Sequence, residues 1–176
     1  SLKFRVKSFS SYYKKMLRKI GQADSEDKNP NIRDILGIRN VCPFLENLQS
    51  VEEILREHYT LFEVERKGAE HSFREFGYQS IHLLLELPEE VREHYMDLDI
   101  GVCEVQVRTI LQDAWSEVEH ELVYKAHFTP YDESLRRKLA ALNANLSLSD
   151  VIFQEIRDYQ RNLHNELKKR RRSFAE

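Results

Sequence analysis

The segment VCEVQVR at residues 102–108 constrains the fold more than any other part of this sequence, because its apolar and polar side chains alternate. Successive side chains of a β-strand point to opposite faces, so this period of two predicts a strand. One face would enter a core while the other displays Glu104, Gln106 and Arg108 in a row. Taken alone, the pattern also fits a half-exposed antiparallel strand without a chemical role.

An amphipathic helix is predicted directly after this strand, over residues 110–125. Leu111, Trp115, Val118 and Leu122 recur along one stripe, a spacing typical of a helix that buries one face. The far end of the helix adds polar side chains, among them His120. The strand and the helix together therefore place many polar side chains beside one edge of the predicted core.

The remaining segments predict further strands and helices around this unit. Apolar runs rich in β-branched residues predict strands at residues 35–44, 61–66 and 80–87. Apolar spacing and capping residues predict helices at residues 8–20, 50–59 and 89–96. Ser50 is the expected N-cap of the second of these, because Glu53 three residues later completes a capping box. The polar stretch at 67–77 is expected to be a loop.

The C-terminal region is predicted to be entirely helical. Leucine, isoleucine and tyrosine recur at three- and four-residue spacing from Leu135 to Leu167, and Ser149 with Asp150 is expected to start a second helix. The apolar seam fits packing on the sheet or on a partner helix from another subunit. We therefore expect one α+β domain with a mixed sheet of four to five strands, divided into a core at 1–130 and a helical extension at 131–176.

The charge of the chain is unevenly distributed. The net charge is −3, yet the first 19 residues contain seven basic side chains and no acidic one, and residues 168–172 are all basic. The rest of the chain is therefore acidic. A basic segment on an acidic body is compatible with a polyanionic small molecule, with nucleic acid, or with pairing to its own acidic neighbours.

Several classes of protein are excluded or disfavoured by composition. The mean hydropathy is −0.61, and no apolar stretch approaches the ~18 residues of a membrane span. The five glycines form neither a dinucleotide-binding fingerprint nor a P-loop. Cys42 and Cys103 stand singly, which predicts buried thiols without a disulfide framework or a zinc site. With no leader pattern at its start, the chain is expected to be cytoplasmic.

Two further positions suggest chemistry when combined with the strand at 102–108. Asp34 precedes the first buried strand, and if that strand neighbours Glu104, the two carboxylates could hold Mg²⁺. Alternatively, Asp34 is an ordinary turn residue. In FGYQSIH at 76–82, Tyr78 offers a ring for base stacking, and His82 shares its strand face. The plain alternative is an edge-strand tyrosine with a surface histidine.

The order of these motifs resembles the synthetase domain of the RelA/SpoT-type alarmone synthetases, small single-domain members included. The similarity rests on RVKSFSSYYKK at 5–15, DILGIR at 34–39, GYQSIH at 77–82, and EVQVRT at 104–109 running on to Trp115, Glu119-His120 and Tyr124-Lys125. The resemblance implies a nucleotidyltransferase-like fold and transfer of pyrophosphate from ATP to the 3′-hydroxyl of GTP or GDP, which yields (p)ppGpp and AMP. It also implies a homotetramer in many members.

The resemblance further implies a role for each matching residue. The residues implied for ATP are Arg5, Lys7, Ser11, Lys15 and Arg39. Asp34 and Glu104 are the implied ligands of Mg²⁺, with Mn²⁺ as a substitute, and Glu104 is the candidate acceptor of the 3′-hydroxyl proton. The residues implied for the acceptor nucleotide are Lys67, Arg74, Tyr78, His82, Gln106, Arg108 and His120.

The loop before Tyr78 departs from the family pattern K-D-Y-I-x-x-P-K-x-N-G-Y. Lys67 and Arg74 keep the two positive charges, but the Asp-Tyr-Ile, Pro and Asn residues are absent. This departure leaves two alternatives open: a toxin-like relative that transfers pyrophosphate to the 3′ end of tRNA, and a catalytically silent nucleotide-binding module. The chain has no His-Asp dipeptide and no room for the family's hydrolase domain, so a bifunctional enzyme is not expected.

Overall fold

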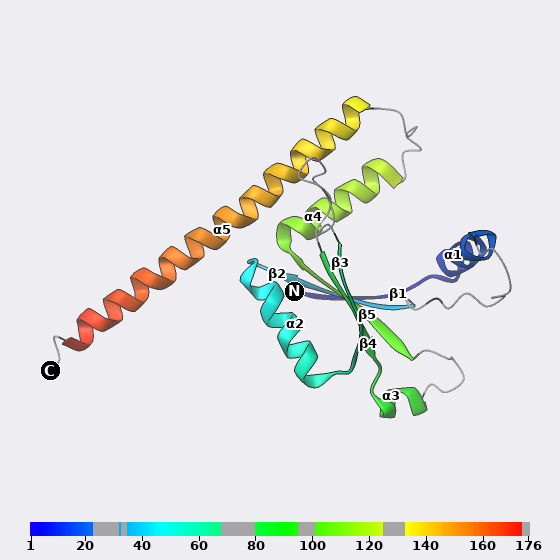
Figure 1. Cartoon of the computed structure of the whole chain (residues 1–176), viewed down its shortest axis with the longest axis horizontal. Helices are drawn as coiled ribbons and strands as arrows, with labels where there is room; N and C mark the ends of the chain where they lie inside the picture. The colour runs from blue at the N-terminus through cyan, green and yellow to red at the C-terminus, as the bar shows by residue number, and fades with distance from the viewer. Residues whose placement is uncertain (23–31, 33–34, 68–79, 95–100, 125–132, 174–176) are drawn as a thin grey trace.

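The computed structural model describes residues 1–22, 32, 35–67, 80–94, 101–124 and 133–173 (Figure 1). In chain order the elements are β1 (Leu2–Val6), α1 (Phe9–Gln22), β2 (Leu36–Cys42), α2 (Glu46–His58), β3 (Leu61–Lys67), β4 (Ser80–Glu86), α3 (Glu89–His94), β5 (Val102–Thr109), α4 (Ile110–Glu119), a π-helix (His120–Tyr124) and α5 (Glu133–Ser173). The chain is thus α+β, as the sequence predicts.

A five-stranded mixed sheet forms the centre of the molecule, with the strand order β1-β2-β5-β4-β3. Strands β2 and β5 pair in parallel, with Gly37 opposite Glu104, whereas the other neighbouring strands are antiparallel. On the other side of β5, His82 lies opposite Gln106. The alternating strand at 102–108 is therefore central in the sheet, and its polar residues lie between β2 and β4.

The apolar face of the sheet packs against α2. The buried cluster combines Cys42 with Leu83, Leu85, Val105 and Val107. Leu48, Val51 and Leu55 of α2 lie against this cluster. Both cysteines are buried free thiols, as predicted, and burial raises the pKa of each. Because α2 closes this face, the polar side chains of β5 lie on the opposite face.

Helix α4 begins where β5 ends and leads to α5, which extends far beyond the sheet (Figure 1). Thr109 caps α4: its side chain accepts a hydrogen bond from the backbone N–H of Gln112, and the Gln112 side chain accepts one from the backbone N–H of Thr109. The Oγ1 of Thr109 also donates to the buried Asp150 of α5 at 2.6 Å. These contacts fix α4 relative to β5 and to α5.

The structure corrects several of the predicted elements. No element was predicted before the helix at 8–20, but residues 2–6 form edge strand β1, whose side chains are all exposed. Helix α2 begins at Glu46 rather than at Ser50. The Ser50 hydroxyl donates to the Glu46 carbonyl at 3.2 Å, so it does not cap a helix end.

Helix α5 is also longer than predicted, because it runs without a break through Ser149 and Asp150. The Ser149 hydroxyl donates to the carbonyl of Asn145 at 2.8 Å, one turn back in the helix. A serine bonded in this way continues a helix rather than starting one. The helix predicted at 110–125 instead changes to a π-helix at His120. None of the described helices is long and apolar enough to cross a membrane.

Candidate active site

A pocket of about 380 Å³ lies on the polar face of the sheet, over β1, β2 and β5 and beside α4. Its lining includes five cationic or amide side chains and two carboxylates: Lys3, Arg5, Lys7, Arg39, Gln106, Glu104 and Glu117. The volume falls in the usual range for small-molecule sites, and the cationic lining favours an anionic ligand.

Glu104 is held in place by two neighbours. The Nδ1 of His82 lies 2.8 Å from its Oε1, and Nε2 of Gln106 donates to its Oε2 at 3.0 Å. Because a carboxylate oxygen accepts, the His82 Nδ1 carries the proton. His82 is only 7% exposed, whereas the Glu104 side chain is 23% exposed. The carboxylate is therefore oriented from behind and accessible from the pocket.

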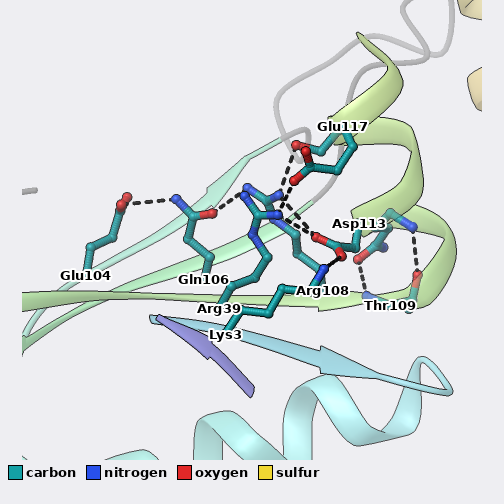
Figure 2. Close-up of polar contacts among 10 residues, drawn as sticks. Lys3, Arg39, Glu104, Gln106, Arg108, Thr109, Asp113 and Glu117 are labelled. Atoms are coloured by element: carbon teal, nitrogen blue, oxygen red, sulfur yellow. Dashed lines mark hydrogen bonds and ion pairs between the residues drawn. The ribbon is translucent and has the colours of Figure 1, made fainter. Parts of the chain in front are cut away.

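The polar row on β5 continues to Arg108 (Figure 2). Nη2 of Arg108 donates to Oε1 of Gln106 at 2.5 Å, and Nη1 donates to the Ser116 hydroxyl of α4 at 2.9 Å. Arg108 is buried, and it does not line the pocket. Its contact with Gln106 fixes that side chain, which in turn orients Glu104. The contact predicted between Arg108 and the acceptor nucleotide stays a prediction.

An ion-pair network joins α4 to β1 and β2 (Figure 2). Asp113 accepts from Nζ of Lys3 at 2.8 Å and from Nη1 of Arg39 at 2.9 Å, and the same Arg39 nitrogen pairs with Glu117. Although burial opposes it, the combined effect of the neighbouring cations lowers the pKa of Asp113. The hydrogen bond from Arg39 is the main cause of the lowered pKa of Glu117.

The structure brings together five of the residues predicted from sequence, because Arg5, Lys7, Arg39, Glu104 and Gln106 all line the pocket. His82 lies behind Glu104 rather than in the lining. Other predicted residues lie elsewhere: Ser11 and Lys15 are on α1, Lys67 ends β3, and the exposed His120 begins the π-helix. Asp34, Arg74 and Tyr78 lie outside the described residues.

The sequence analysis missed three residues of this site: Lys3 and Glu117, which line the pocket, and Asp113, which pairs with Lys3 and Arg39. A signal was present for the two acids, since residues four apart lie on one face of a helix. Their partner Arg39, however, is 74 residues from Asp113 and 78 residues from Glu117 in the chain. A local sequence pattern does not predict a contact between residues so far apart.

The metal site predicted at Asp34 and Glu104 stays a prediction, because the structure describes only one of the two residues. Strand β2 begins two residues after Asp34 and runs parallel to β5, with Gly37 opposite Glu104. Glu104 lines the pocket, whereas Asp34 lies outside the described residues. Among the described residues, which exclude Asp34, no three His, Cys, Asp or Glu side chains cluster to hold a metal ion.

Comparison with known proteins identifies relatives of the whole core. The family model "Region found in RelA / SpoT proteins" matches residues 4–129. GTP pyrophosphokinase YwaC of Bacillus subtilis (strain 168) is 33% identical over 123 residues, which cover 70% of this chain and 57% of that protein. GTP pyrophosphokinase YjbM of the same organism is 30% identical over 158 residues, covering 87% of this chain and 69% of that protein.

A solved structure agrees with these relatives. The crystal structure of small alarmone synthetase 1 from Bacillus subtilis bound to its product pppGpp is 27% identical, with a TM-score of 0.71. The match covers 90% of this chain and 78% of that one. The chain spans little more than half of YwaC but most of the other two proteins. By its matched residues and its fold, this chain belongs to the RelA/SpoT family.

Proposed function

We propose that this chain transfers pyrophosphate from ATP to the 3′-hydroxyl of GTP or GDP, giving (p)ppGpp and AMP. The observation that carries the proposal is the position of Glu104, whose carboxylate is oriented by His82 and Gln106 at a pocket with Arg5, Lys7 and Arg39. The activities named for YwaC and YjbM and the product named for the solved synthetase support the same reaction.

Arg5, Lys7 and Arg39 would hold the donor nucleotide. Ammonium and guanidinium groups neutralise phosphate oxygens, and a guanidinium also stacks on an adenine ring. All three side chains line one pocket with Glu104, so a triphosphate bound to them would lie beside the carboxylate. This arrangement supplies binding charge without a glycine-rich loop. Ser11 and Lys15 on α1 are proposed as further contacts to ATP.

The transfer itself would be an in-line displacement. The 3′-oxygen of the acceptor forms a bond to the β-phosphorus of ATP, and the bond from that phosphorus to the oxygen bridging the α-phosphate breaks. AMP leaves with the bridging oxygen, and the proton of the 3′-hydroxyl passes to the Glu104 carboxylate. Catalysis then consists mainly of positioning and charge neutralisation.

Asp34 and Glu104 are the residues proposed to hold Mg²⁺, or Mn²⁺ in its place. Bound there, the ion would neutralise phosphate charge and orient the triphosphate. Two carboxylates suffice, because Mg²⁺ keeps several waters and takes further ligands from phosphates. The accessible face of the Glu104 carboxylate and the parallel pairing of β2 with β5 fit this assignment.

The residues proposed to bind the acceptor are Lys67, Arg74, Tyr78 and His120, together with His82, Gln106 and Arg108 of the sheet. Tyr78 supplies a ring that can stack on the guanine of the acceptor. The side chains of Lys67, Arg74 and His120 complement the phosphates of that nucleotide. The reaction would operate in the cytoplasm, where both nucleotides are available. Core residues 1–130 would suffice for these contacts, while α5 in the extension at 131–176 exposes apolar side chains that suit a homo-oligomer contact.

The proposal is tested by incubating the protein with Mg²⁺, ATP and one acceptor, namely GTP, GDP or tRNA, and resolving the nucleotides by anion-exchange chromatography. We expect (p)ppGpp and AMP in equal amounts with a guanine nucleotide. Transfer to tRNA alone would favour the toxin-like alternative. Glu104→Gln is the matched control, and unchanged turnover in this variant would contradict the proposed role of the carboxylate.

A further inference from the structure

The known bonds of the Arg39 guanidinium all involve one nitrogen, Nη1. Its Nη1 donates both to Oδ1 of Asp113, at 2.9 Å, and to the carboxylate of Glu117. Within the described parts of the chain, Nε and Nη2 of Arg39 make no hydrogen bond or ion pair. One corner of the guanidinium is therefore fixed (Figure 2), while the Arg39 side chain, which is 24% exposed, also lines the pocket.

The two carboxylates that hold Arg39 differ in their surroundings. The Asp113 side chain is 9% exposed. It also forms ion pairs with Lys3 and, at 3.8 Å, with Arg108. Glu117 lines the pocket with a side chain that is 63% exposed, and its hydrogen-bonding partner is Arg39. Asp113 thus connects the pocket to the buried polar row, whereas within the described residues the ion-pair partner of Glu117 is Arg39.

The platform that carries these two acids is itself well fixed. Both lie on α4, whose first turn is capped by Thr109, and Thr109 is bonded to the buried Asp150 of α5. Side chains four residues apart lie on the same helix face, so Asp113 and Glu117 both reach Arg39 of β2 from α4. A fixed helix therefore determines where the Arg39 guanidinium lies.

We propose that Glu117 and Asp113 are positioning residues for the donor nucleotide, which hold Arg39 in its binding orientation before ATP enters the pocket. The inference rests on the proposed function, because it takes ATP as the ligand of Arg39. Immobilising a long side chain normally opposes binding, and two anchors on one nitrogen remove most of that entropy loss in advance. Nε and Nη2, which make no bond within the described residues, remain suited to phosphate oxygens, and a guanidinium plane can also stack on an adenine ring.

The charge of Glu117 could also have the opposite effect on ATP binding. Glu117 is a carboxylate in the lining of an anion-binding pocket, so it could instead repel the triphosphate. Under that alternative, removing its charge strengthens ATP binding. Under the positioning proposal, removing its charge weakens ATP binding, because Arg39 loses one anchor.

The test is Glu117→Gln in the full chain, which keeps the shape of the side chain and removes its charge. Isothermal titration with a non-hydrolysable ATP analogue should give a Kd raised about two- to fivefold, the range for one exposed ion pair. In steady-state assays the KM for ATP should rise by a similar factor, with kcat and the KM for GTP unchanged. An unchanged or lowered Kd would overturn the proposal.

A double-mutant cycle shows whether Glu117 acts through Arg39. In an Arg39→Gln background, Glu117→Gln should leave the Kd of the analogue unchanged within error, since the anchored group is gone. An equal loss in both backgrounds would contradict the proposed route. Glu133→Gln is the control, because Glu133 pairs with Arg137 on the exposed surface of α5, away from the pocket lining.

The binding measurement separates this inference from the proposed function. A wild-type protein that binds the ATP analogue but makes no (p)ppGpp would overturn the reaction only, and the Kd comparison would still decide the role of Glu117. A wild-type protein that binds no analogue would overturn both. The melting temperature of Glu117→Gln should stay within about 3 °C of wild type, given the small energy of such a pair.

Discussion

Nδ1 of His82 lies 2.8 Å from Oε1 of Glu104, so a buried imidazole on β4 orients the carboxylate that β5 presents to the pocket. The second oxygen of Glu104 accepts from Gln106, which is itself held by Arg108. Each carboxylate oxygen thus has a fixed donor. The strand register produces this arrangement, because His82 lies opposite Gln106, which is two residues along β5 from Glu104 and on the same strand face.

The contact predicts that His82 affects turnover more than substrate binding. His82→Ala removes the donor, and we expect kcat to fall about 10- to 100-fold, the loss typical of a displaced catalytic group. The KM for ATP should stay near that of wild type, because His82 does not line the pocket. His82→Gln, which keeps an N–H donor, should recover part of the rate. Wild-type kcat in His82→Ala would contradict this role.

Asp113 should stabilise the fold in a manner that depends on pH. Its pKa is lowered in the folded protein, so its contribution is present above the unfolded value of about 3.9 and is lost as the pH falls through the folded value. Asp113→Asn should lower the free energy of unfolding at pH 7 by about 3 kcal/mol, because three cations lose their shared partner. Urea unfolding from pH 3 to 8 should show this difference shrinking below about pH 4. A difference independent of pH would contradict the assignment.

Asp150 should show the opposite dependence. Burial raises its pKa, although the hydrogen bond from Thr109 counteracts the shift. Its contribution to stability is therefore complete below the unfolded value and declines as the pH rises through the raised folded value. Asp150→Asn keeps an oxygen that accepts from Thr109, so its stability relative to wild type should improve from pH 4 to pH 8. Paired urea titrations measure this, and a relative loss with rising pH would contradict it.

The exposed apolar side of α5 predicts self-association. Ile156 is 50% exposed and Leu163 is 45% exposed, while Arg161 on another side of the helix pairs with Glu46 of α2. Ile156→Glu with Leu163→Glu should shift the protein toward a monomer in light scattering coupled to size-exclusion chromatography. Because both side chains are already half exposed, the melting temperature of the isolated subunit should change little. A wild-type monomer at all concentrations would exclude the oligomer.

Much of the fold was predictable from local pattern. The alternation at 102–108 predicted both faces of β5, and Val105 and Val107 are buried as expected. Strand β1 was missed because its five residues are all exposed, so its alternation of apolar and basic side chains was interpreted as charge alone. The helix starts predicted at Ser50 and Ser149 were wrong. A serine hydroxyl that can cap a helix can also donate to the carbonyl one turn back within it, as both of these do.

The candidate site was predictable only in part. The motifs singled out Glu104 and Gln106, and these two residues line one pocket with Arg5 and Arg39. The sequence could not show that Arg108 is buried behind the row, since alternation places it on the same face as Glu104. Burial there depends on α4, which crosses the end of β5 and supplies Ser116 and Asp113.

The central claim is tested most directly by following the label from ATP that carries ³²P at the β-phosphorus, with GTP as acceptor and Mg²⁺ present. The account predicts that the label appears in a guanosine pentaphosphate, that unlabelled AMP forms in equal amount, and that Glu104→Gln reduces transfer at least 100-fold. Label released only as inorganic phosphate or pyrophosphate, or retained in ADP, would contradict it.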